Sequence, residues 1–244
     1  MDILSFIFPK KCVVCKKHGS YLCENCFSFL SFDPKSLCLL CNNPSFNNLT
    51  HPKCRRKYAI DGCFSALSYN KTAQKLFYNF KYKPYLTDLK NVLTDLFYES
   101  IIQNEQFQSQ IKNGEWIFVP IPLSSSKLRK RGYNQAEILA DELSRKFNFP
   151  VQNLLKRTKE TKTQVGLSNP QRKLNVKEAF EIINHPSASS GHGSESLGSK
   201  RFRKNCSIFL VDDVATTGST LLEAAKILKR NGAKKVFGLT LARD

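Results

Sequence analysis

Acidic residues are scarce in this chain, and long apolar runs are absent from it. The 244 residues include 20 Asp and Glu against 38 Lys and Arg, which gives a formal net charge of +18. No apolar run reaches the about 18 residues that a bilayer-spanning helix requires. The apolar start MDILSFIFPKKC has neither a basic leader nor a small-residue cleavage site, so it does not resemble a signal peptide. We therefore expect a cytoplasmic protein with no transmembrane segment and at most a weak membrane association.

The excess of positive charge predicts an anionic partner. Residues 116–183 are the most basic part of the chain, with 13 basic and 6 acidic side chains. Within them, the stretch SKLRKRGYNQ contains a basic cluster that consists of Lys127, Arg129, Lys130, Arg131 and the neighbouring Tyr133. Cations that follow a phosphate backbone, next to aromatic rings on which bases stack, are typical of single-stranded nucleic acid binding. The same cluster also suits the pyrophosphate group of a small ligand, or a solvated charged surface.

Cysteine is abundant only in the N-terminal quarter of the sequence. Eight of the nine cysteines lie within the first 63 residues, mostly as Cys-x-x-Cys pairs, which favours metal binding in a reducing compartment over a disulfide framework. Four ligand pairs are present: Cys12 and Cys15, Cys23 and Cys26, Cys38 and Cys41, and His51 and Cys54. These eight ligands predict one or two tetrahedral, structural Zn²⁺ sites. The spacing leaves open whether consecutive or interleaved pairs share a metal.

Downstream of the cysteines, the apolar pattern predicts helices that alternate with strands. Helical spacing over 70–112, interrupted by Pro84, predicts two helices, whereas 154–168 is expected to be a mobile basic loop. The further elements are a strand at 116–123, a helix at 134–147, a strand at 206–214, a helix at 219–233 and a strand at 235–243. This alternation is typical of an α/β fold in which helices cover both faces of a parallel sheet.

Composition also divides the chain into regions. We predict a cysteine-rich zinc module at 1–63, followed by an α/β domain at 64–244. Within that domain, residues 185–200 contain six serines and three glycines. Such a composition cannot bury a core, so this segment is predicted to be a disordered insert.

The segment IFLVDDVATTGST, residues 208–220, combines an apolar strand with an acid pair and a loop of small residues. Asp212 and Asp213 stand at the carboxyl end of the predicted strand, which is where ligands bind in α/β sheets. The loop that follows enters a helix, whose N-terminal N–H groups and dipole favour a phosphate. This loop consists of Ala215, Thr216, Thr217, Gly218, Ser219 and Thr220. Carboxylates for sugar hydroxyls beside donors for a phosphate suit a 5-phosphorylated ribose, although an exposed acid pair before a capped helix is the alternative.

This segment resembles the phosphoribosyl pyrophosphate (PRPP) signature of type I phosphoribosyltransferases. The resemblance implies that Asp212 and Asp213 hold the 2- and 3-hydroxyls of the ribose and that residues 215–220 hold its 5-phosphate. It also implies that Mg²⁺ accompanies PRPP on the pyrophosphate and ribose oxygens.

Other segments are similar to the ComF family, which joins an N-terminal zinc module to such a domain. The family's Arg-Gly-Phe-Asn-Gln motif stands here as Arg131-Gly132-Tyr133-Asn134-Gln135, and its Leu-Lys-Tyr segment resembles FYNFKYK at Phe77–Lys83. Its Leu-Ser…Arg…Asn-Val pattern stands here as Leu167, Ser168, Arg172, Asn175 and Val176. The resemblance implies handling of single-stranded DNA during natural transformation, with a competence helicase or a recombination mediator as partner.

The sequence is compatible with three functions. The first is handling of single-stranded DNA together with PRPP binding, the second is an active phosphoribosyltransferase, and the third is a PRPP sensor without turnover. In the enzyme, Asp212 or Asp213 would stabilise the positive charge that develops as pyrophosphate leaves the anomeric carbon. Because no segment identifies an acceptor base, we favour the DNA-handling hypothesis and leave catalysis undecided.

Overall fold

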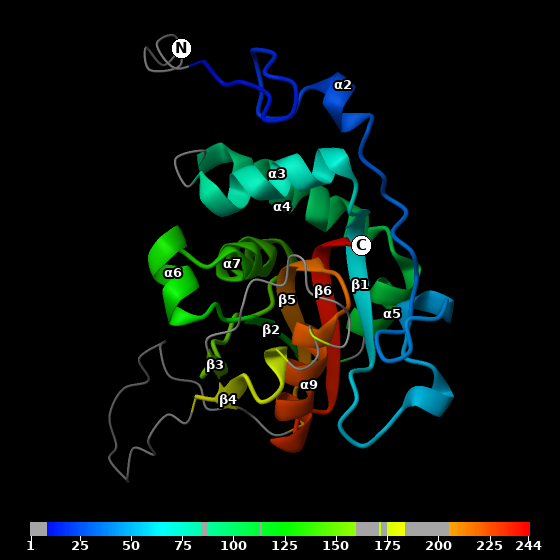
Figure 1. Cartoon of the computed structure of the whole chain (residues 1–244). Coiled ribbons are helices and arrows are strands. Elements are labelled where there is room, and N and C mark those ends of the chain that lie inside the picture. The colour runs from blue at the N-terminus through cyan, green and yellow to red at the C-terminus, as the bar shows by residue number, and fades with distance from the viewer. Residues whose placement is uncertain (1–8, 84–86, 113, 160–170, 172–174, 184–204) are drawn as a thin grey trace.

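The computed structural model describes residues 9–83, 87–112, 114–159, 171, 175–183 and 205–244. Its centre is a four-stranded sheet in the order β1-β6-β5-β2, with every neighbouring pair parallel (Figure 1). The strands are β1 (Gly62–Ser68), β2 (Trp116–Pro120), β5 (Ser207–Ala215) and β6 (Lys235–Arg243). All four carboxyl ends therefore lie at one edge of the sheet. The predicted α/β fold with a parallel sheet is confirmed.

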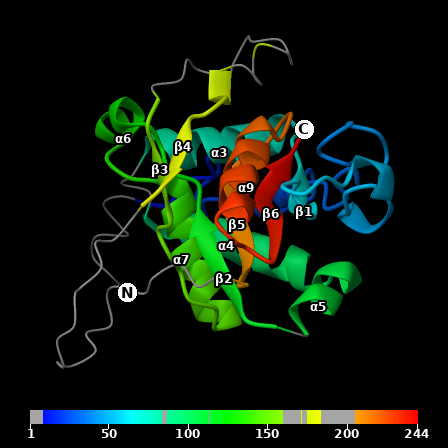
Figure 2. The ribbon, with the colours of Figure 1, turned by 90° about the horizontal axis from the view of Figure 1, so that it is seen from below.

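Helices cover both faces of the sheet (Figures 1 and 2). On one face, side chains of four helices form a single apolar core with Phe209 and Phe237. These helices are α3 (Lys71–Tyr82), α4 (Thr87–Ile102), α5 (Glu105–Ile111) and α7 (Gln135–Phe147). On the other face, α9 (Ser219–Arg230) packs on Ile208 and Leu210. Of the covering helices, α3 lies beyond the carboxyl edge, where it can reach ligands bound there (Figure 1).

Local sequence signals set the ends of several helices. The side chains of Asn70 and Asn134 occupy the N-cap positions of α3 and α7 and accept hydrogen bonds from N–H groups in the first turn. Gly132, at φ 80°, ends the short helix α6 (Ser125–Arg131) in a left-handed conformation. The sequence predicted a strand through residue 123 and then a polar turn, whereas the strand ends at Pro120 and α6 follows. The Ile121 N–H still donates to the carbonyl of Val211 at 2.9 Å, so the chain leaves the sheet just after this bond.

The predicted basic loop at 154–168 is partly wrong. Residues 155–157 form strand β3 (Leu155–Arg157), which pairs antiparallel with β4 (Phe180–Ile182) in a second, two-stranded sheet. Leu155 and Phe180 are buried in the α9-side core, and this burial holds the pair in place. Residues 160–168 and the predicted insert at 185–200 lie outside the described residues.

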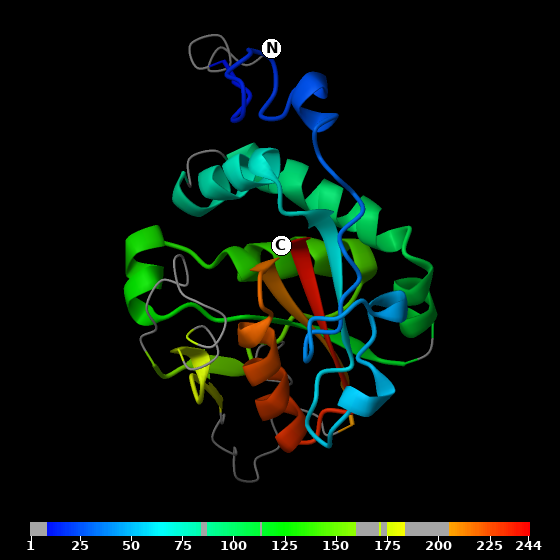
Figure 3. The ribbon, with the colours of Figure 1, turned by 45° about the vertical axis from the view of Figure 1, so that its right-hand side comes forward.

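The N-terminal segment runs along two sides of the domain (Figure 3). Its first part lies beside α3 and α4, where Lys10 pairs with Asp88 at 2.5 Å. Its second part follows β1 through a bridge between Leu49 and Gly62. The helical turns among its described residues, from residue 9 on, are short: α2 (Glu24–Phe27), η1 (Phe46–Asn48) and η2 (Pro52–Cys54). Strand β1 was not predicted, and it spans residue 63, where the sequence placed the boundary between the zinc module and the α/β domain. The position of that boundary stays a prediction.

The described part of the chain contains no helix that has both the length and the hydrophobicity needed to cross a membrane.

Candidate functional site

The acid pair lies at the carboxyl end of β5, and its two side chains have different surroundings. Asp212 is the register partner of Thr240 in β6. Asp213 is largely buried and forms an ion pair with Lys81 of α3, in which Nζ and Oδ2 are 2.8 Å apart. Burial lowers the pKa of Lys81, but the attraction to Asp213, the hydrogen bond with it and the nearby charge of Asp212 together outweigh burial, so the pKa of this lysine is raised and it stays charged. The sequence analysis did not name Lys81, although the stretch FYNFKYK, which contains it, was one of the resembling segments.

Asp212 carries less charge than its position suggests. Burial, followed by the nearby charge of Asp213, raises the pKa of Asp212 to about 7, against the opposing effect of the Asp213 N–H group. That N–H donates to Oδ1 of Asp212 at 2.8 Å. The positive charges of Lys81 and Arg157 also favour the ionised form, but they do not outweigh the first two effects. At neutral pH Asp212 is therefore close to half-protonated, and the acid pair is far less negative than two free carboxylates.

The loop after the acid pair turns sharply into α9. Gly218 stands at its N-cap with φ 68°, the left-handed region that favours glycine, and this residue has no side chain with which to cap the helix. The first N–H group of the helix, that of Ser219, donates to Thr217 Oγ1 at 3.4 Å. The hydroxyls of Thr217 and Ser219 lie 2.7 Å apart and bond to each other, and both residues are buried. Thr216 and Thr220 are half-exposed. A helix N-terminus that follows a loop of small residues is an arrangement that binds phosphate.

The basic cluster divides into an inward and an outward part. Arg131 is half-buried, bonds Gln135 at 2.9 Å and lies close enough to Lys81 to affect its pKa. The hydroxyl of Tyr133 donates to the carbonyl of Phe80, which connects the loop between α6 and α7 to α3. In contrast, Arg129 and Lys130 are exposed, and Lys127 is half-exposed.

Two exposed aromatic rings on α3 lie beside this cluster and were missed by the sequence analysis. Tyr78 is 59% exposed and Tyr82 45%, with ring centroids 5.0 Å apart. The guanidinium of Arg131 lies 5.3 Å from the Tyr82 ring centre. Their four-residue spacing on a helix was the available signal, but helical periodicity alone could not separate them from the core residues Phe77 and Phe80.

The basic residues of the segment 154–168 lie apart from the basic cluster of α6 in the sequence. Arg157 stacks near Phe180 at 5.3 Å and contributes its charge to Asp212. Lys159 pairs with Glu178 at 3.5 Å. Four residues named from the sequence lie outside the described residues: Lys162, and Leu167, Ser168 and Arg172 of the family pattern.

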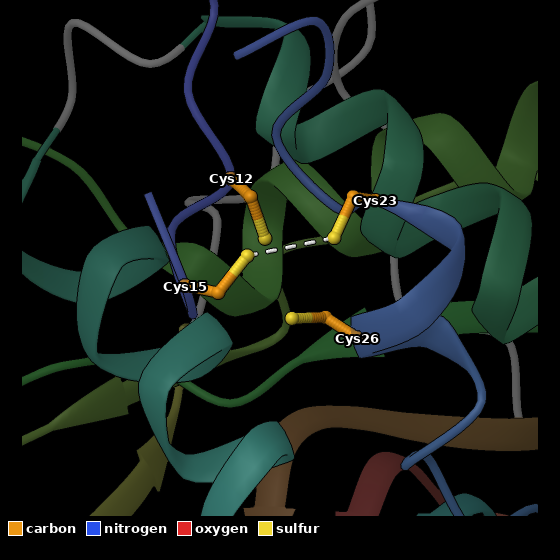
Figure 4. Close-up of side chains that lie close together, drawn as sticks. All are labelled: Cys12, Cys15, Cys23 and Cys26. Carbon is orange, nitrogen blue, oxygen red and sulfur yellow. Dashed lines mark hydrogen bonds between the residues drawn. The ribbon is translucent and has the colours of Figure 1, made fainter. Parts of the chain in front are cut away.

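The eight predicted metal ligands form two separate clusters of four. Cys12, Cys15, Cys23 and Cys26 make the first cluster, in which all four side chains point toward one centre (Figure 4). Cys38, Cys41, His51 and Cys54 make the second. Within each cluster all ligand atoms lie within 4.8 Å of one another, which fits one tetrahedral Zn²⁺. Consecutive pairs therefore share a centre, and the interleaved alternative is excluded.

The surroundings of two of these ligands favour the thiolate that a metal binds, whereas burial and the neighbouring thiols raise the pKa of Cys26 and of Cys54. Burial opposes the charged form of Cys12, but N–H groups of Cys15, Cys23 and Val14 outweigh it and lower the pKa of Cys12 to about 6. The pKa of Cys38 is lowered in the same way. The Nδ1 atom of His51 faces Cys41 Sγ at 3.3 Å, while Nε2 lies 2.9 Å from the carbonyl of Pro44. A ring nitrogen held by a carbonyl leaves the other free to bind metal, as in many zinc sites.

Two family models match separate parts of the chain. Residues 3–56 match the model of the double zinc ribbon domain, and residues 130–243 match that of the phosphoribosyl transferase domain. Together with the two clusters, the first match supports structural zinc.

Three relatives show how far the similarity extends. Competence protein ComFC of Bacillus subtilis is 28% identical over 93% of this chain and 86% of its own length. Competence protein F of Haemophilus influenzae is 39% identical over 55% of this chain and 52% of its own. DNA utilization protein YhgH of Escherichia coli is 35% identical over 51% and 48%. The chain thus spans about half the length of the latter two. The chain therefore combines a match to a double zinc ribbon with a match to a phosphoribosyl transferase domain, and it is similar to competence and DNA utilization proteins.

Proposed function

We propose that this protein handles single-stranded DNA during DNA uptake and binds PRPP at the β5–α9 loop. A role in DNA uptake is supported by relatives named as competence and DNA utilization proteins. The phosphoribosyl transferase match covers the loop and the acid pair. The proposal divides into a sugar-phosphate site and a DNA surface, which are argued separately.

The Lys81–Asp213 ion pair is the observation that carries the sugar-phosphate site. An anionic ligand is repelled by two full carboxylates, but here Lys81 balances Asp213 and the pKa of Asp212 is raised to about 7. Both acids can therefore accept hydrogen bonds from ribose hydroxyls without a large negative field. The N–H groups at the start of α9 would hold the 5-phosphate.

Arg131 and Lys81 place positive charge beside the acid pair, on the side of α3. Positive charge there suits the pyrophosphate of PRPP, which Mg²⁺ would accompany because that ion prefers phosphate oxygens. The same charges would stabilise departing pyrophosphate if the site turns over. An active phosphoribosyltransferase is therefore the second candidate function.

The DNA surface is the exposed part of α6 together with Tyr78 and Tyr82 of α3. It combines exposed cations, Arg129 and Lys130, with two exposed rings. Aromatic rings that stack bases, beside cations that follow phosphates, bind single strands with little sequence preference. Because Arg131 contacts Tyr82, this surface adjoins the sugar-phosphate site.

Two titrations test the proposal. Fluorescence anisotropy of a labelled single-stranded oligonucleotide, repeated at several salt concentrations, should show affinity whose logarithm falls linearly with the logarithm of salt. Calorimetry with PRPP and Mg²⁺ should show binding that disappears in Asp213→Ala. No DNA binding at low salt would remove the DNA-handling function. Release of pyrophosphate from PRPP with an added acceptor would favour the enzyme instead.

A further inference from the structure

Leu39 lies between two ligands of the second metal cluster in the sequence, and its side chain is part of the apolar core on the α9 side of the sheet. It lies between the ligands Cys38 and Cys41, yet it is only 2% exposed. Its neighbours in the α9-side core include Ile60 and Leu221. A metal-binding turn thus inserts an apolar side chain between α9 and the sheet.

The contact that Leu39 makes is with the turn of the phosphate loop. A methyl group added at Gly218 would lie 3.2 Å from Leu39 Cγ and 3.4 Å from Cδ1, and closer to Cδ2 than any real carbon contact allows. The Leu39 side chain therefore sits directly on the Cα of Gly218. Gly218 has φ 68° and is the N-cap of α9, so the residue that Leu39 covers sets the direction of the helix N-terminus.

A hydrogen bond made by Arg243 also connects the segment that contains Leu39 to the β5–α9 loop. Arg243 of β6 is the register partner of Ala215, the first residue of the loop. Its side chain is buried and its Nη1 donates to the carbonyl of Leu37 at 3.0 Å. Residues 37–39 are thus fixed to both ends of the turn, at Ala215 through Arg243 and at Gly218 through Leu39.

The first metal cluster provides a natural comparison. Val13 occupies in Cys12-Val13-Val14-Cys15 the position that Leu39 occupies in Cys38-Leu39-Leu40-Cys41. Val13 is also buried, at 5% exposure, but it belongs to the core on the α3 and α4 side. The two clusters therefore resemble each other in ligand spacing and differ in what their inserted side chain supports.

We propose that Leu39 is a positioning residue for the phosphate loop, so that metal in the second cluster, but not in the first, sets the loop's affinity for a sugar phosphate. The inference rests on the proposed sugar-phosphate site. The physical reason is that metal ligation at Cys38 and Cys41 fixes the backbone on both sides of Leu39. Without the metal, this short turn loses its constraint and Leu39 no longer holds Gly218. The helix N–H groups then lose the fixed geometry that makes phosphate binding favourable.

Binding of ribose 5-phosphate, measured by calorimetry on the full chain, tests this inference. Leu39→Ala should weaken binding by about tenfold or more, which corresponds to about 1.4 kcal/mol. The matched control Val13→Ala should change affinity by less than about twofold, although both variants lose thermal stability through the cavities they create. Leu39→Met, which nearly conserves volume, should restore most of the affinity. Equal affinities for wild type and Leu39→Ala would overturn the inference.

A measurement without ligand separates the inference from the proposed function. Hydrogen exchange of the backbone amides at 215–221 should be faster in Leu39→Ala and unchanged in Val13→Ala. Cys41→Ala, which removes a ligand of the second cluster, should speed the same exchange, whereas Cys15→Ala in the first cluster should not, and metal content measured on each variant shows which metal is lost. If the wild type binds no ribose 5-phosphate, the proposed sugar-phosphate site fails, and the exchange result still decides whether Leu39 holds the loop. Unchanged exchange in Leu39→Ala would contradict the inference whatever the ligand does.

Discussion

The Nζ atom of Lys81, on α3, lies 2.8 Å from Oδ2 of Asp213, at the end of β5. The pair joins the helix beyond the carboxyl edge to the strand that carries the acid pair, and both side chains are largely shielded from water. An ion pair in this position has two effects. It neutralises one acid of a site proposed to bind an anion, and it fixes α3 relative to the sheet.

Replacing Lys81 by Met should destabilise the protein and weaken PRPP binding. Removing one partner leaves a buried, unpaired charge on Asp213, which typically costs about 3 kcal/mol or more. Chemical denaturation and calorimetry with PRPP and Mg²⁺ measure the two effects. Lys146→Met is the control, because Lys146 pairs with the exposed Asp95 on the protein surface, where an ion pair contributes about 1 kcal/mol or less. Equal losses in the two variants would contradict the role assigned to Lys81.

Replacing Asp212 by Asn should raise stability at pH 8 and change it little at pH 4. The folded-state pKa of Asp212, about 7, is above its ordinary value of 3.8. Ionisation therefore costs folding energy, which accumulates as pH rises between these values and is fully present above pH 7. Since the site is partly open to solvent, we expect a gain on the order of 2 kcal/mol. Thermal unfolding at several pH values measures it, and a gain independent of pH would contradict the raised pKa.

Metal stoichiometry of double variants should show consecutive pairing. The wild type is expected to bind two zinc ions, one in each cluster. Cys15→Ala with Cys23→Ala removes ligands from one cluster and should leave one zinc. Cys15→Ala with Cys41→Ala damages both clusters and should leave none. Interleaved pairing would reverse the two results, and elemental analysis of the purified variants distinguishes them.

Tyr78→Ala and Tyr82→Ala should each weaken single-stranded DNA binding. Base stacking on an aromatic ring contributes about 1–3 kcal/mol, so we expect an affinity loss of roughly tenfold for each change. Arg129→Ala should instead lower the salt dependence, by about one unit of slope if it contacts a phosphate. Phe46→Ala is the control, because Phe46 is 83% exposed but lies on η1 and not on α3. Anisotropy titrations that show equal losses for Phe46 and the tyrosines would argue against the surface.

The sequence predicted the parts of the molecule whose cause is local. The apolar run before Asp212 and Asp213 and the small residues after them predicted a strand, a tight turn and a helix N-terminus, and β5 and α9 follow that pattern. The Cys-x-x-Cys spacing predicted the metal ligands, because two ligands in one short turn face the same point. Strand β1 escaped prediction because the mixed stretch GCFSALS has no clear period, and only its pairing with β6 makes it a strand.

Residues far apart in the sequence were brought together only by the tertiary structure. Lys81 meets Asp213 because α3 passes over the edge where β5 ends, and no local pattern encodes that approach. Consecutive pairing of the zinc ligands depends on how the N-terminal segment is laid along the domain, which keeps the two clusters apart. By itself, the sequence determined the types of the metal ligands, the tight turn between β5 and α9 and the alternation of strands and helices. Contacts such as that of Leu39 with Gly218 were decided by packing, because burial couples side chains through space and not through their order in the chain.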